Sequence, residues 1–151
     1  MRTGVRIGID VGTVRVGVAR SDSTGMLAVP VATVRQGAAA IAEVAAIAAE
    51  FEALEVLVGH PINMSGKSGK SAIMAQQFAA DLAAVVDPVP VRMVDERNTT
   101  TQAHRHLQAS GISTRNGRSV IDQVAAVIIV QHALDAERIS GTPLGTIVRA
   151  T

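Results

Sequence analysis

The chain has 151 residues, of which 48% are hydrophobic and 18% are charged, and its formal net charge is +1 at pH 7. This length predicts one domain over residues 1–151, with a core at about 5–136 and a loose tail at 137–151. The small net charge excludes a protein that is basic throughout, so nucleic-acid binding would need a local basic patch. With Phe51 and Phe78 as its aromatic residues and no cysteine, the chain lacks the material for a base-stacking surface, a disulfide or a zinc knuckle.

The first third of the chain predicts three successive strands joined by short turns. Apolar runs separated by Gly-Thr and Ser-Thr-Gly give strands at 5–11, 14–21 and 27–34. An alanine-rich segment follows, in which apolar residues recur at helical spacing. It predicts a helix over 37–52.

The rest of the chain alternates between strands and helices. We expect strands at 56–59 and 91–95, helices at 71–86, 99–109 and 120–136, and loops at 59–70 and 111–118. The most apolar segment, 124–130, is too short to span a membrane, and the N-terminus shows no signal peptide. The expected fold is therefore α/β, a mixed five-stranded sheet with helices on both faces, in a cytoplasmic protein.

Acidic residues fall where predicted strands end or where the final helix begins. Asp10 ends the first strand, Asp95 and Glu96 end the strand at 91–95, and Asp122 falls in the first turn of the last helix. The carboxyl ends of parallel strands share one edge of a sheet, so these side chains are expected to converge. Such a group suits one or two Mg²⁺ (or Mn²⁺) ions, which prefer oxygen ligands. Neighbouring strand residues point to opposite faces, so only one of Asp95 and Glu96 can face Asp10.

Each acid also has a purely structural interpretation. Asp10 precedes a Gly-Thr turn, where aspartate is common in any protein. Asp122 follows Ser119 by three positions and could complete a helix capping box. Asp95 and Glu96 could belong to a solvated charge cluster with Arg97.

Basic residues near these acids are candidate phosphate contacts. The segment 66–71 resembles a nucleotide-binding P-loop but lacks the glycine that the motif requires, so we interpret it as a loop whose lysines meet backbone phosphates or solvent. His132, late in the last helix, suits the helix dipole. The candidate nucleic-acid-binding residues are Arg15, Lys67, Lys70, Arg97, Arg115 and Arg118.

Four motifs occur in order along the chain: GIDVGTVRVGVA at 8–19, VGHPINMSG at 58–66, DERNTT at 95–100 and IDQVAA at 121–126. Together they resemble the YqgF/RuvX family, RNase H-like proteins described as pre-16S rRNA nucleases or Holliday junction resolvase homologues. The resemblance implies an RNase H-like fold, with Asp10, Glu96 and Asp122 as catalytic metal ligands and Asp95 as an alternate acid. His60, Asn98 and Val14 depart from the family pattern, but no acid is lost.

The resemblance leaves three functions open. The first is a metal-dependent nuclease that processes the 5′ end of precursor 16S rRNA. The second is a resolvase that cuts four-way DNA junctions, for which a homodimer would be favoured. The third is a non-catalytic protein of ribosome assembly or transcription. An ATPase of the sugar kinase, actin or Hsp70 type shares the first motif but needs more than twice this length.

Overall fold

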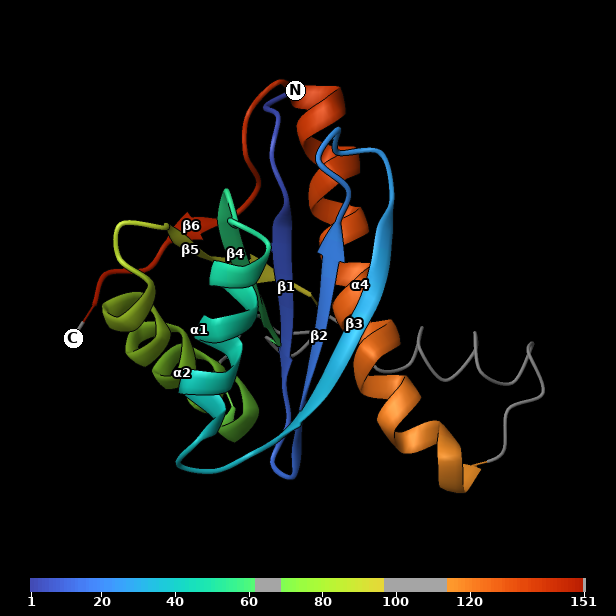
Figure 1. Ribbon diagram of the computed structural model, residues 1–151, viewed down its shortest axis with the longest axis vertical. Helices are drawn as coiled ribbons and strands as arrows, with labels where there is room; N and C mark the ends of the chain where they lie inside the picture. The colour runs from blue at the N-terminus through green and yellow to red at the C-terminus, as the bar shows by residue number, and fades with distance from the viewer. Residues whose placement is uncertain (62–68, 97–113, 151) are drawn as a thin grey trace.

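The computed structural model describes residues 1–61, 69–96 and 114–150, with side chains in the last range described from residue 121 onward. Six strands form one sheet in the order β3-β2-β1-β4-β5-β6 (Figure 1). Strands β1, β4 and β5 run parallel, whereas β2, β3 and β6 each join antiparallel. The strands are β1 (Arg6–Val11), β2 (Arg15–Ser21), β3 (Ala28–Arg35), β4 (Glu55–His60), β5 (Val91–Asp95) and β6 (Thr146–Ile147).

Side-chain alternation in β1 divides the molecule into two packed layers. Ile7, Ile9 and Val11 belong to the larger hydrophobic cluster on one face of the sheet. Gly8 and Asp10, between them in the chain, therefore point to the other face. The strand that carries the predicted catalytic aspartate thus also builds the core.

Helices cover both faces of the sheet, as the sequence predicts. Helices α1 (Ala40–Glu50) and α2 (Lys70–Val86) pack on the face of Ile7 and Ile9. Helix α4 (Thr114–Ser140) packs on the opposite face (Figure 1). On that side, Ala126, Val130 and Leu134 of α4 meet Ala19 and Ala28.

Three glycines on neighbouring strands allow α4 to lie close to the sheet. A Cβ atom at Gly8 would come within 2.2 Å of Val130, and one at Gly17 within 2.0 Å of the Asp122 carbonyl oxygen. A Cβ at Gly59 would meet the end of Ile129 at 2.6 Å. Side chains at these positions would push α4 outward, so the glycines set the distance between Asp122 and the sheet.

The structure corrects three expectations about the C-terminal third. The loop predicted at 111–118 gives way to α4 at Thr114, so Arg115 and Arg118 lie in a helix. Residues 137–140, expected in a loose tail, continue α4, and Glu137 is buried. Thr146 and Ile147 add a short sixth strand to the expected five by pairing with Met93 and Arg92. The helix predicted at 99–109 lies outside the described residues.

None of the described helices combines the length and the apolar character that crossing a bilayer demands.

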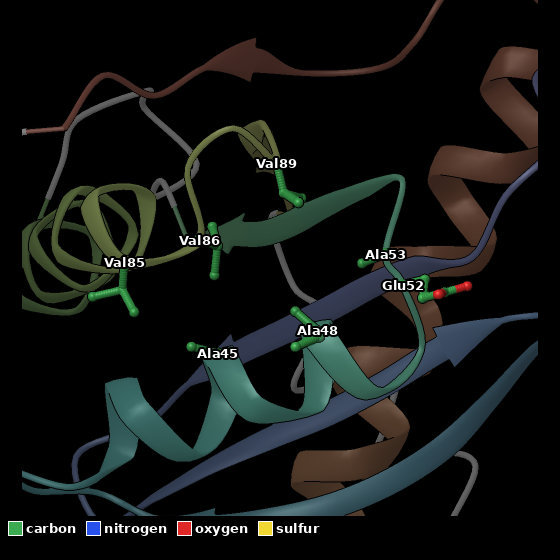
Figure 2. A pocket seen from close by; sticks show the side chains of 8 residues that line it. Ala45, Ala48, Glu52, Ala53, Val85, Val86 and Val89 are labelled. Atoms are coloured by element: carbon green, nitrogen blue, oxygen red, sulfur yellow. The ribbon is translucent and has the colours of Figure 1, made fainter.

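A cavity of about 390 Å³ lies between α1 and α2 (Figure 2). Alanine and valine side chains line it, including Ala45, Ala48, Val85 and Val86, and Glu52 is the charged residue among its described lining. It occupies the face of the sheet opposite Asp10. Because polar groups do not converge on it, the cavity is a poor candidate for the catalytic site.

Candidate active site

The structure brings Asp10 and Asp122 together from two distant parts of the chain. Asp10 lies near the end of β1, on the face covered by α4, and its cross-strand partner in β2 is Gly17. The backbone of Asp122 rests directly over Gly17, where a side chain would clash with it. The two carboxyl groups are close enough for the charge of Asp122 to raise the pKa of Asp10.

Burial and mutual repulsion both disfavour the ionised form of Asp10. Loss of solvent is the larger cause and the charge of Asp122 the second, and together they raise the pKa of Asp10 to about 7. Burial also raises the pKa of Asp122, although a hydrogen bond and the positive charge of Arg15 oppose that rise. Near neutral pH the pair therefore holds less negative charge than two free aspartates, and an added cation would stabilise its ionised form.

Arg15, a predicted phosphate contact, forms an ion pair with Asp122. Its Nε atom donates to Asp122 Oδ2 over 2.8 Å, and the Arg15 side chain is 32% exposed. The guanidinium therefore stands at the rim of the acidic pair and remains reachable from solvent. This position suits a side chain that neutralises Asp122 and meets a phosphate beside it.

Asp122 lies deeper in its helix than the sequence predicts. Helix α4 begins at Thr114, so Asp122 is not in the first turn and Ser119 is not the N-cap. The capping-box interpretation of Asp122 is therefore wrong. The carboxylate faces the sheet because Asp122 lies on the same side of α4 as Ala126 and Ile129, which are fully buried there.

Asp95 and Glu96 diverge at the end of β5. Val94 packs on the α4 face and Met93 on the opposite face, which places the exposed Asp95 on the side away from Asp10. Glu96 is 8% exposed and reaches α4, where its Oε1 atom accepts a hydrogen bond from His132 Nδ1 over 2.5 Å. Of the two acids, Glu96 thus shares its face of the sheet with Asp10 and Asp122.

Asp10, Asp122 and Glu96 do not form a closed metal cage in this structure. Among the described residues, no three histidine or acidic side chains are grouped closely enough to hold a metal ion. Asp10 and Asp122 nevertheless fit a divalent cation, because they are oxygen donors that repel each other in a partly buried position. Glu96 lies on the same face but is held by His132.

The predicted basic residues fall into three groups. The first group has described side chains: Lys70 is the exposed first residue of α2, and Arg15 is paired with Asp122. Arg115 and Arg118 lie in the first two turns of α4. Lys67 and Arg97 lie outside the described residues, so the phosphate contacts predicted for them stay predictions.

Sequence reasoning missed the pairing of His132 with Glu96. It assigned His132 to the helix dipole, and no spacing in the sequence connects position 132 with position 96. The one available clue is local, because His132 follows the buried Ile129 by three residues and so continues its face of α4 toward β5.

Comparison with known proteins places the chain in a family. A family model described as "RuvX: Holliday junction resolvase" matches residues 4–136. The chain belongs to the RuvX family. It is 48% identical to a protein of Thermobifida fusca named "Putative pre-16S rRNA nuclease", over 100% of this chain and 99% of that one. A Streptomyces coelicolor protein of the same name is 50% identical, over 96% and 88% of the two chains.

Solved structures confirm the RNase H-like fold of this RuvX chain. The structure titled "T. thermophilus RuvC in complex with Holliday junction substrate" matches with a TM-score of 0.59, over 94% of this chain and 99% of that one. Sequence identity in that match is 17%, so the likeness concerns the fold alone. The predicted fold class and family are thereby confirmed.

Proposed function

We propose that this chain is a divalent-metal-dependent nuclease that hydrolyses phosphodiester bonds at the 5′ end of precursor 16S rRNA. The observation that carries the proposal is the pairing of Asp10 with Asp122 on the α4 face of the sheet. The full-length relatives named as pre-16S rRNA nucleases support the choice of substrate. Such precursors are cytoplasmic in bacteria, so the proposal also places the chain in the cytoplasm.

In this proposal Asp10 and Asp122 hold Mg²⁺ or Mn²⁺, and Glu96 contributes the third carboxylate. When bound, the metal activates water and stabilises the leaving oxygen of the phosphodiester. Arg15, at the rim of the acidic pair, binds the phosphate and favours the ionised form of Asp122 against the effect of burial. Lys70, exposed at the start of α2, provides a further contact to a phosphate of the nucleic-acid backbone.

A second candidate function is the resolution of four-way DNA junctions. The description of the matching family favours it. Cutting two symmetry-related strands would need a two-fold dimer that presents two such sites. A monomeric native mass of the purified protein in solution would therefore count against the second function, because a junction needs two sites whereas cutting an RNA end needs one.

The test offers both substrates to the purified protein. A precursor 16S rRNA fragment with its 5′ extension and a synthetic four-way DNA junction are incubated with Mg²⁺, with Mn²⁺ and with EDTA. We expect metal-dependent cleavage of the RNA within its 5′ extension and an intact junction. Cleavage of the junction alone would overturn the choice of substrate, and cleavage of neither by folded protein would favour the binding-protein alternative.

A further inference from the structure

The pairing of β5 with β4 fixes the backbone of Glu96 but does not by itself determine where its side chain lies. It is the first residue after β5, and its backbone N–H donates to the His60 carbonyl oxygen over 3.2 Å, which extends the β4–β5 pairing by one step. A glutamate has several rotatable bonds beyond this anchored backbone. Something other than the strand must therefore hold its carboxylate on the face of Asp10 and Asp122.

The described partner of that carboxylate on α4 is His132. The Nδ1 atom of His132 lies 2.5 Å from Glu96 Oε1, and since an ionised carboxylate only accepts, the imidazole donates. Glu96 is 8% exposed, whereas the His132 side chain is 50% exposed. The imidazole is therefore a surface side chain whose inner nitrogen reaches a buried acid.

Helix α4 is a rigid support for this contact. Ile129, one turn before His132, is fully buried and packs with Leu57, Val94 and Ala133. The same helix carries Asp122. The hydrogen bond from His132 thus connects Glu96 to α4, the same helix that positions Asp122 next to Asp10.

We infer that His132 is a positioning residue, whose hydrogen bond fixes the Glu96 carboxylate for the divalent metal held by Asp10 and Asp122. The inference rests on the proposed metal-dependent function. Hydrogen-bonding partners of ligating carboxylates usually contribute 10- to 100-fold to metal affinity. Loss of the imidazole should weaken metal binding by about this factor, although His132 itself does not touch the metal.

The experiment measures Mn²⁺ affinity by isothermal titration calorimetry, with no nucleic acid present. His132→Ala removes the donor, whereas His132→Asn keeps an N–H donor at the place of Nδ1. Asp135→Asn is the matched control, because it removes a half-exposed charge from the same helix that pairs with Arg138. Thermal unfolding of every variant checks that α4 is intact.

Four results together are expected. His132→Ala binds Mn²⁺ about 10- to 100-fold more weakly, His132→Asn stays close to wild type, and Asp135→Asn is unchanged. In a Glu96→Ala background, His132→Ala has no additional effect, because the carboxylate that His132 would position is already absent.

The outcomes separate this inference from the proposed function. If Asp10→Asn loses Mn²⁺ binding but His132→Ala binds as tightly as wild type, the role of His132 is overturned and the metal site stands. If His132→Ala lowers Mn²⁺ affinity by the same factor with and without the Glu96 side chain, the role of His132 is also overturned. If the wild-type protein binds no Mn²⁺, the proposed function and this inference fail together.

Discussion

Replacing Glu137 with alanine is expected to lower the free energy of unfolding by about 3–5 kcal/mol. The Glu137 carboxylate is 5% exposed and accepts from Arg6 Nη2 over 3.0 Å, where the Arg6 side chain is 1% exposed. Arg2 also donates to it, through its backbone N–H over 3.1 Å and its Nη2 atom over 2.5 Å. Without Glu137, the buried guanidinium of Arg6 would lose its carboxylate partner.

Urea unfolding at neutral pH measures this effect, and Asp135→Asn provides the comparison. Asp135 lies on the same helix, but its ion pair with Arg138 is about half exposed on both sides, so its loss should cost no more than about 1 kcal/mol. Burial would raise the pKa of Glu137, but hydrogen bonds and charges from Arg2 and Arg6 lower it to about 2. Its contribution is thus complete above pH 4.5 and lost as the pH falls toward 2. A Glu137→Ala protein as stable as Asp135→Asn would contradict this role.

Replacing Asp10 with asparagine is expected to stabilise the metal-free protein at neutral pH, even though it removes a proposed catalytic group. The pKa of Asp10 rises from 3.8 to about 7, through burial first and the charge of Asp122 second. The folded protein therefore binds this proton more tightly than the unfolded chain does. Between pH 4 and pH 7 the wild-type protein loses stability as the pH rises, and above pH 7 the loss is complete.

Unfolding in urea with EDTA at pH 5 and pH 8 tests this prediction. Asp10→Asn should have a higher free energy of unfolding than wild type, and this difference should be a few kcal/mol larger at pH 8 than at pH 5. It should increase by about 1.4 kcal/mol per pH unit up to pH 7. Glu50→Gln, which changes an exposed acid on α1, should show no such growth. Mg²⁺ should stabilise the wild-type protein more than Asp10→Asn, because it binds the ionised pair. If the difference in free energy of unfolding between Asp10→Asn and wild type does not change with pH, the raised pKa of Asp10 is contradicted.

Most of the sheet could be predicted because its strands carry a strong local pattern. Ile7, Ile9 and Val11 alternate with small or polar residues, and the parallel strands β4 and β5 are short segments in which valine, leucine and methionine predominate. The start of α4 could not be predicted in this way. Asn116 and Gly117 have weak helix propensity, and polar residues at 114–119 hide the apolar spacing that marks the rest of the helix.

The site could be predicted only as far as strand ends determine it. The turn that follows Asp10 marks it as a candidate site residue, and alternation in β5 limits the choice between Asp95 and Glu96. The partners were not predictable, because they depend on where α4 crosses the sheet. Gly17 brings Asp122 over β2, and the same crossing brings His132 to Glu96 and Glu137 to Arg6. These contacts join residues distant in sequence, and no motif records them.

The most direct test of the central claim is the rate at which Asp10→Asn cleaves the precursor 16S rRNA fragment in Mg²⁺, beside wild type and Glu50→Gln. The proposed site predicts equal cleavage by wild type and Glu50→Gln, and a loss of about 1,000-fold in Asp10→Asn, since several kcal/mol of metal-assisted stabilisation disappear. Because Asp10→Asn should be at least as stable as the metal-free wild-type protein at neutral pH, unfolding would not account for that loss. Cleavage by Asp10→Asn at the wild-type rate would contradict the assignment of the active site.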